Sequence, residues 1–397
     1  MLRRPKMNTF QQNGVTMQKQ QLLTQSTKKK RSERKQSVMK KHFISCLLFL
    51  GLVILFSTGV VAEDNKEVKA EVLALNLENP SGLAIHPETG DVFIASRYGI
   101  YRYQPKEHKM NIEIDNYATD VYGKGPRYNI GPLGLTFIDK NHLVVADGSR
   151  KDGEELVRIY KLTKGSVENK TKLKYAKEDS AAFTLGPIKA SEKSKNGEGN
   201  FFGVTIGAGN IFVTCHGDDT KGWIAKSKFK DGKPGKLELF IATKEVLQVD
   251  APSAIMMSAD GEDLVVAQMG EITQAGDSLL VTYNPKDGKM RKKYTTGLND
   301  IVGLAISPKT KKVYATDFSW IDTSKGGLFE LTIDGDKITA KKILSLDKPS
   351  AIAFDKEGRL YLTVFGTAPK ANVKKEETKK KVSPLAPGKL LRIDAGL

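Results

Sequence analysis

Cysteine is nearly absent from this chain, whose 397 residues include only two, Cys46 and Cys215. Because Cys46 lies in an apolar segment near the N-terminus, Cys215 is the single cysteine of the remaining chain. No internal disulfide can form there, so the stability of that part must come from its packed core.

Motifs that identify several common enzyme classes are also missing. The sequence has no glycine-rich phosphate loop, no Cys-x-x-Cys or His-Glu-x-x-His metal motif and no Gly-x-Ser-x-Gly elbow. Helical patterns are almost absent after residue 62. These absences disfavour the nucleotide-binding, metallopeptidase and serine-hydrolase classes that the motifs define.

The formal net charge of +17 is unevenly distributed. Residues 1–62 hold 12 of the 63 Lys and Arg side chains and only one acid, Glu33. The other 335 residues therefore carry a net charge of only +6. Since that part shows no basic stripe interleaved with aromatic residues, we expect no nucleic-acid partner.

An uncharged apolar run, Phe43–Ala62, follows the basic N-terminus. The sequence predicts a signal peptide at residues 39–62, with small residues before a cleavage point at Ala62, or an uncleaved membrane anchor. Residues 1–38 are then a basic leader or a mis-assigned start. Under either interpretation residues 63–397 lie outside the cytoplasm, periplasmic or secreted if cleaved and membrane-anchored through residues 43–62 if not.

One pattern recurs six times in residues 63–397: a small residue within an apolar run, a polar turn, and a second apolar run. Examples are PSGLAIHPETGDVFIAS from Pro80 and IVGLAISPKTKKVYATD from Ile301. The runs are rich in β-branched and aromatic residues and read as hairpins. The aligned small residues are Gly82, Gly134, Gly203, Ala254, Gly303 and Ala351.

Each repeat continues with a third apolar strand and, less clearly, a fourth, as in Ile100–Tyr103 and Met110–Ile114. Four strands per unit of about 50 residues is typical of a propeller blade. The last repeat stops after its third strand at Ile393, while a spare strand, Glu71–Leu77, precedes the first. We therefore predict an all-β fold, a six-bladed β-propeller with four antiparallel strands per blade. The N-terminal strand is expected to complete the last blade and remove two open sheet edges.

These repeats resemble the blades of NHL-repeat proteins and of the gluconolactonase/luciferin-regenerating-enzyme superfamily, which is calcium-dependent phosphotriesterase-like. The resemblance covers about Glu71–Ile393. It implies the six-bladed fold but leaves function open, because relatives include calcium- or zinc-dependent lactonases, ester hydrolases and non-enzymatic binding modules.

In the metal-dependent relatives, the residue before each aligned small residue includes acidic and amide ligands of a divalent ion. Here that column contains three serines and three apolar residues: Ser81, Leu133, Phe202, Ser253, Val302 and Ser350. Carboxylates lie nearby at Asp218, Asp250 and Asp300, and hard cations prefer such oxygen ligands. They are candidate ligands for calcium or zinc, although Asp before a strand is also common for conformational reasons.

The ends of the second strands should lie on the same face. His216 is the only imidazole expected there, which makes it the candidate general base, or equally a metal ligand or an exposed turn residue. Cys215 precedes it on a strand, so the two side chains should point to opposite faces. Candidate ligand-binding residues around it are Arg97, Trp223, Gln268, Phe318 and Trp320. The aromatic members would equally suit packing between blades.

Three function classes follow. The first is an exported, monomeric module that binds a small molecule, glycan or protein on its channel face. The second is a divergent metal-dependent lactonase or ester hydrolase, and the third is a quinone-dependent sugar dehydrogenase. The sequence does not decide whether the protein is an enzyme.

Overall fold

The computed structural model describes residues 68–162, 173–174, 180–216, 221–368, 386–394 and 396–397. The chain divides into two units, Met1–Asn65 and Lys66–Leu397, and the description below concerns the second. The expected signal peptide or anchor lies outside the described residues. Among the residues that are described, no helix is sufficiently long and apolar to cross a membrane.

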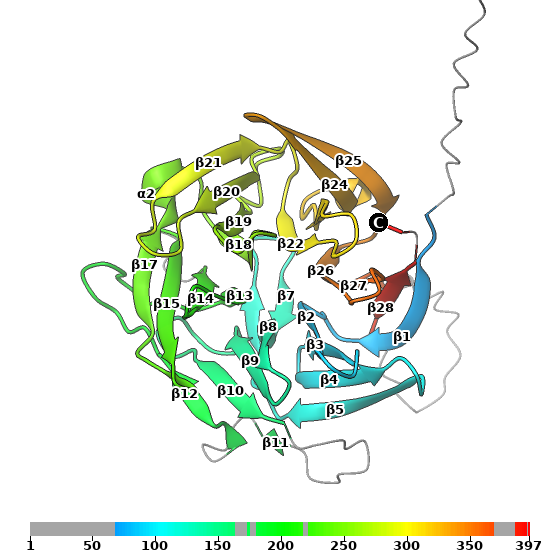
Figure 1. The fold of residues 1–397 in the computed structure, drawn as a ribbon, viewed down its shortest axis with the longest axis horizontal. Helices are drawn as coiled ribbons and strands as arrows, with labels where there is room; N and C mark the ends of the chain where they lie inside the picture. The colour runs from blue at the N-terminus through cyan, green and yellow to red at the C-terminus, as the bar shows by residue number, and fades with distance from the viewer. Residues whose placement is uncertain (1–67, 163–172, 175–179, 217–220, 369–385, 395) are drawn as a thin grey trace, which may run out of the picture. The chain divides into compact units, whose positions relative to one another are not determined.

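Six antiparallel sheets surround a central axis (Figure 1), which confirms the predicted propeller. Blade 1 contains β2 (Gly82–Ile85), β3 (Val92–Ser96), β4 (Gly99–Gln104) and β5 (Lys109–Asp115). Blade 2 contains β8 (Pro132–Asp139), β9 (His142–Asp147), β10 (Val157–Lys161) and β12 (Phe183–Leu185). Blade 3 contains β13 (Phe201–Gly207), β14 (Asn210–Cys215), β15 (Trp223–Lys230) and β17 (Glu238–Ala242).

Blades 4 and 5 follow in the same order. Blade 4 contains β18 (Pro252–Met257), β19 (Leu264–Gln268), β20 (Leu279–Tyr283) and β21 (Met290–Thr295). Blade 5 contains β22 (Ile301–Ile306), β23 (Val313–Asp317), β24 (Gly327–Asp334) and β25 (Lys337–Ser345). Short additional elements are β11 (Leu173–Lys174) beside β5, β16 (Lys233–Pro234) beside β15, the helix α2 (Thr243–Leu247) and the 3-10 turn η2 (Thr323–Lys325).

The ring closes as the sequence predicts. Blade 6 takes β26 (Pro349–Phe354), β27 (Leu360–Val364) and β28 (Gly388–Ile393) from the C-terminal part and β1 (Glu71–Leu77) from the N-terminal part. Strand β1 pairs antiparallel with β28, placing Glu71 opposite Arg392 and Leu77 opposite Gly388. The two ends of the propeller are thus held in one sheet.

The aligned small residues have a packing explanation. A Cβ atom added to Gly82 would lie 1.7 Å from the carbonyl oxygen of Leu133, on the innermost strand of the next blade. A Cβ atom added to Gly203 or to Gly303 would likewise lie 2.5 Å from the carbonyl oxygen of Ser253 or of Ser350. The repeat therefore records the tight spacing of neighbouring inner strands around the axis.

The hydrophobic core is distributed between blades. Of the seven clusters of buried apolar residues in the described chain, six each join two neighbouring blades. The cluster between blades 2 and 3, for example, packs Val144 and Ile159 against Phe201 and Val213. Every blade is therefore stabilised by two neighbours, and ring closure supplies the last interface.

Candidate functional site

A hairpin that belongs to no blade covers the channel face. It consists of β6 (Asp120–Tyr122) and β7 (Tyr128–Ile130), inserted between the last strand of blade 1 and the first of blade 2. Its side chains contact residues of blades 3, 4, 5 and 6. The hairpin therefore reaches across the mouth of the channel.

An aromatic cluster lies beneath this hairpin. The ring of Tyr128 packs edge-on against Phe318, Trp320 and Phe365, with ring centroids 5.1–5.6 Å apart. The Trp320 indole donates a hydrogen bond of 2.7 Å to the carbonyl of Pro126 in the hairpin turn. Phe318, Trp320 and Phe365 are all nearly buried, so the centre of the channel face is filled by side chains.

His216 is part of the same closure. Its Nε2 lies 2.7 Å from the carbonyl oxygen of Pro252. Because a carbonyl oxygen can only accept a hydrogen bond, Nε2 carries the proton. The other ring nitrogen, Nδ1, accepts a hydrogen bond of 3.0 Å from the Tyr122 hydroxyl. The imidazole also stacks on Phe202 at 5.1 Å. Burial lowers the pKa of His216 to about 4, against weaker opposing effects of Pro252 and Asp250. The imidazole is therefore neutral at pH 7, with both ring nitrogens hydrogen-bonded.

Beside the hairpin lies a cavity of about 230 Å³. Its walls come from the hairpin, from the loops that precede β13 and β18, and from the loop that follows β19. Polar lining residues are Lys124, Asp152, Asn200, His216, Asp250 and Glu271, and apolar ones are Val121, Met269 and Ile272. It holds about eight times the volume of a water molecule in the liquid, enough for a small polar ligand.

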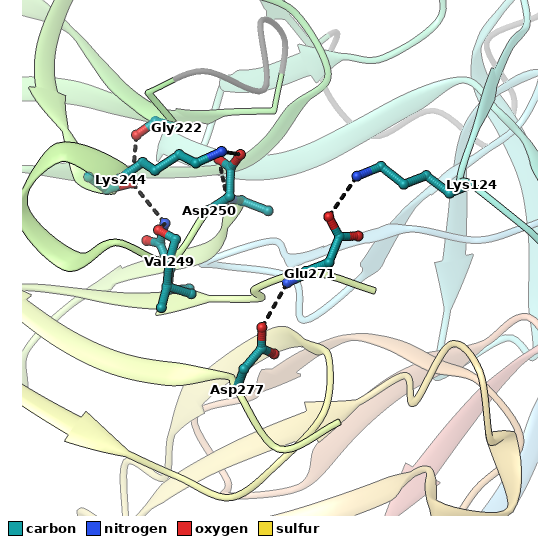
Figure 2. A network of polar contacts seen from close by, with 10 residues as sticks. Lys124, Gly222, Lys244, Val249, Asp250, Glu271 and Asp277 are labelled. Atoms are coloured by element: carbon teal, nitrogen blue, oxygen red, sulfur yellow. Dashed lines mark hydrogen bonds and ion pairs between the residues drawn. The ribbon is translucent and has the colours of Figure 1, made fainter. Parts of the chain in front are cut away.

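Two ion pairs organise this cavity (Figure 2). Lys124 on the hairpin contacts Glu271 at 2.7 Å, and Lys244 on α2 contacts Asp250 at 2.6 Å. The Lys124 and Glu271 side chains are 57% and 45% exposed, so this pair adds little to stability and both groups can reach a ligand.

Asn200 supplies an unused acceptor in the cavity wall. Its Nδ2 lies 3.4 Å from Asp152 Oδ1, whereas its Oδ1 is buried and has no hydrogen-bond partner in the described structure. Its backbone is left-handed (φ 43°), a conformation that asparagine tolerates well. Because this oxygen has almost no accessible surface, a ligand in the cavity reaches it only after the Asn200 side chain rotates.

Asp300 lies on the blade 5 side of the channel mouth. Its Oδ2 accepts a 2.6 Å hydrogen bond from the Trp320 backbone N–H, whereas its Oδ1 is buried without a partner among the described residues. Burial, together with the nearby carboxylates of Asp317, Asp277 and Glu271, raises the pKa of Asp300 to about 7, against the lowering effect of the hydrogen bond from the Trp320 backbone N–H. Asp300 therefore positions Trp320, on which the hairpin packs.

The structure separates the predicted ligand-binding residues. Phe318 and Trp320 lie in the aromatic cluster, while Trp223 is nearly buried in the core between blades 2 and 3. Gln268 is fully buried and donates to Thr243 Oγ1 and the Val249 carbonyl, both at 2.8 Å. Arg97 pairs with Glu78 and packs over Tyr98, 4.7 Å from its ring centroid. None of these predicted residues lines the cavity beside the hairpin.

Three serines directly precede an aligned small residue, and each of them has a structural hydrogen-bond partner. Each donates its hydroxyl proton to a backbone carbonyl of the next blade: Ser81 to Pro132, Ser253 to Ile301 and Ser350 to Pro80. These bonds join neighbouring inner strands at the top of the channel, and the last one crosses the closure between blades 6 and 1.

The residues proposed as calcium or zinc ligands do not form a group within the described chain. Asp250 accepts hydrogen bonds from Lys244 and from the Ala251 backbone, and Asp300 accepts from Trp320. Asp218 lies outside the described residues. No three His, Cys, Asp or Glu side chains of the described ranges are arranged to hold a metal ion, so the metal site stays a prediction.

Comparison with known proteins identifies the fold. No protein-family model matches the chain, and no curated protein matches its sequence. A glucose dehydrogenase structure matches with a TM-score of 0.53 at 15% identity, covering 82% of this chain and 99% of that one. The soluble aldose sugar dehydrogenase of Escherichia coli matches at 0.50 and 13%, covering 82% and 99%. A Xanthomonas campestris gluconolactonase matches at 0.50 and 12%, covering 83% and 90%. By fold, the described chain is a six-bladed β-propeller similar to those of gluconolactonases and sugar dehydrogenases.

Proposed function

We propose that this protein is an exported binding module that takes a small polyhydroxylated molecule, a sugar or sugar lactone, in the cavity beside the β6–β7 hairpin. The observation that carries the proposal is the polar wall of this cavity, in which the Asn200 amide lies with two carboxylates and an ammonium group. Sugar hydroxyls donate to carboxylates and amides and accept from ammonium groups, and Asp250, Glu271 and Lys124 offer these partners around it.

The shape of the cavity supports the same ligand class. Its polar residues face Val121, Met269 and Ile272, so one ligand can meet apolar and hydrogen-bonding surface together. A sugar ring has apolar C–H faces and a hydroxyl rim. Sugars are also the compounds named for the structural neighbours, which makes them the first class to test.

Isothermal titration calorimetry of the full-length protein with glucose and with gluconolactone tests this function. Asn200→Gly removes the amide without straining the left-handed backbone, and Glu271→Gln removes one charge. We expect each to weaken binding at least tenfold, because hydrogen bonds to buried or charged groups are worth about 1.5–3 kcal/mol.

Asn116→Gly is the matched control, since Asn116 is also left-handed (φ 71°) but exposed, and it does not line the cavity. Loss of sugar binding in this control, or unchanged binding in both cavity variants, would place the ligand elsewhere.

A divergent lactonase is the second candidate, because His216 lines the same cavity. The hydrogen bond from the Tyr122 hydroxyl to Nδ1 would have to break before that nitrogen could accept a proton from water, because Nε2 already carries its proton. Lactone hydrolysis above the rate in buffer, abolished in His216→Gln, would favour this activity over simple binding. Reduction of a dye by sugar after addition of a quinone cofactor would favour the dehydrogenase instead.

Export is proposed from the N-terminal sequence. The basic residues 1–38 and the apolar run at 43–62 support a cleaved signal or an anchor. Fractionation of the producing cells and N-terminal sequencing of the mature protein distinguish the two. A cytoplasmic protein with an intact N-terminus would contradict both.

A further inference from the structure

The cavity beside the hairpin contains carboxylates, an amide and an imidazole, which are groups that bind calcium or zinc in proteins. The imidazole of His216 has no nitrogen free for a metal ion, because Nε2 donates its proton to Pro252 and Nδ1 accepts from the Tyr122 hydroxyl. The amide oxygen of Asn200 has almost no accessible surface. Neither group can therefore bind a metal ion in the arrangement that the structure shows.

Both oxygens of the Asp250 carboxylate bind groups of the chain itself. Oδ1 accepts a hydrogen bond of 2.7 Å from the Ala251 backbone N–H, and Oδ2 accepts one of 2.6 Å from Lys244 Nζ. The Asp250 side chain is only 19% exposed, so its negative charge needs a cation in direct contact. The Lys244 ammonium supplies that positive charge on the carboxylate oxygen that a metal ion would have to bind.

The backbone of Lys244 is fixed on both sides of the side chain. Its N–H donates to the Lys221 carbonyl, and its own carbonyl accepts from the Gln248 N–H, both at 2.8 Å. Thr243, the preceding residue of α2, donates its N–H and its hydroxyl to the Gly222 carbonyl at 2.8 and 2.6 Å. Lys244 does not line the cavity, so its ammonium reaches Asp250 from outside (Figure 2).

A second carboxylate of the cavity, Glu271, has its own ammonium partner in Lys124 of the hairpin, at 2.7 Å. The third lining carboxylate, Asp152, has its Oδ1 3.4 Å from the Asn200 amide nitrogen. Within the ranges that the structure covers, these acids belong to no group of three side chains arranged for a metal ion. The donor set of the cavity therefore fits lysine ammonium groups better than it fits a divalent ion.

We propose that Lys244 takes the place of a divalent ion in this cavity. Its ammonium neutralises Asp250 and holds its orientation, so the protein binds its ligand without a metal. Lys244 is a positioning residue, because Asp250 and not Lys244 reaches the cavity. The ligand measurements below rest on the proposed sugar binding, whereas the measurements of metal content and stability do not.

Elemental analysis and thermal denaturation of the full-length protein test the absence of a metal requirement. We expect no stoichiometric calcium or zinc, and the same melting temperature in buffer, in EDTA and with added calcium, since an ion raises it only by binding the folded state. Stoichiometric calcium or zinc whose removal lowers the melting temperature would overturn the proposal.

Urea denaturation of Lys244→Met, Asp250→Asn and the double variant tests the ion pair without any ligand. Each single change leaves the other group without its partner, so the two losses of stability should be clearly less than additive in the double variant. Additive losses would show that the ammonium does not neutralise Asp250, and would also overturn the proposal.

Calorimetric titration with glucose tests the positioning role. Lys244→Met should weaken binding about tenfold, because Asp250 loses the charge-assisted hydrogen bond that orients it, and Lys244→Arg should restore most of the affinity. Lys221→Met is the matched control, since it breaks the neighbouring 2.8 Å pair of Lys221 and Glu245, neither of which lines the cavity. It should bind glucose as the wild type does.

Normal glucose binding in Lys244→Met, or an equal loss in Lys244→Arg and Lys244→Met, would overturn the role of the ammonium. A wild type that binds neither glucose nor gluconolactone would contradict the proposed sugar binding instead, and the metal content and the urea measurements then decide the role of Lys244.

Discussion

Replacing Asp300 with asparagine should stabilise the folded protein at neutral and alkaline pH. Asp300 is 2% exposed, and its pKa is raised from 3.8 to about 7. Since the folded state holds this proton more tightly than the unfolded state, wild-type stability falls as pH rises from 3.8 to 7 and then stays level. The difference in pKa corresponds to at most about 4 kcal/mol at pH 8 and less than about 1 kcal/mol at pH 4.

Asparagine keeps the acceptor for the Trp320 backbone N–H and cannot ionise. Asp300→Asn should therefore be more stable than the wild type by up to about 4 kcal/mol at pH 8 and nearly equal to it at pH 4. Urea denaturation at pH 4, 6 and 8, followed by tryptophan fluorescence, measures the difference.

Asp300→Ala separates the ionisation from the hydrogen bond. Alanine also removes the charge but leaves the Trp320 N–H without its acceptor, which costs about 1–3 kcal/mol at every pH. The Asn and Ala variants should therefore differ by a constant amount, while both gain on the wild type as pH rises. An Asn variant with no advantage at pH 8, or with the same advantage at pH 4, would refute the buried ionisation.

Other substitutions test the closure and the inner strands. Tyr122→Phe leaves His216 Nδ1 without its donor and should lower the free energy of unfolding by about 1–2 kcal/mol, as measured by urea denaturation. An unchanged denaturation midpoint would show that this hydrogen bond does not hold the hairpin. Because the pKa of His216 is lowered to about 4, the stability of the wild type should fall as the pH drops from 6.5 to 4. His216→Gln should show a smaller fall, and a pH profile of stability identical to that of the wild type would contradict the buried neutral imidazole. Gly82→Ala brings a methyl group against the Leu133 carbonyl and should abolish folding or lower the melting temperature severely, whereas a stable variant would disprove the tight strand spacing.

The fold was predictable because its main constraint, the close spacing of neighbouring inner strands, recurs around the ring. The close approach seen at Gly82 recurs at Gly134, Gly203 and Gly303, and alanine takes the aligned position in the other two blades, so a small residue marks every repeat in the sequence. The closing strand Glu71–Leu77 could be assigned by counting strands, and its pairing with β28 is confirmed.

The candidate site was harder to predict because it depends on one insertion. The β6–β7 hairpin occurs in a single blade connection, so no repeat marks it, although two tyrosines around Gly-Lys-Gly-Pro are a recognisable hairpin signal. Its place over the channel depends on contacts between residues far apart, 94 positions for Tyr122 and His216 and 194 for Pro126 and Trp320. His216 lines the cavity beside the hairpin, and its role as a general base stays a prediction, while its buried and fully hydrogen-bonded state follows only from those contacts.

The most direct test of the account is a crystal structure of the protein with glucose bound. The account predicts a sugar beside the hairpin, within hydrogen-bond distance of the Asn200 amide and of Glu271, with the hydrogen bond between Tyr122 and His216 intact. A sugar bound on the propeller axis, with the β6–β7 hairpin displaced and the aromatic cluster opened, would contradict it.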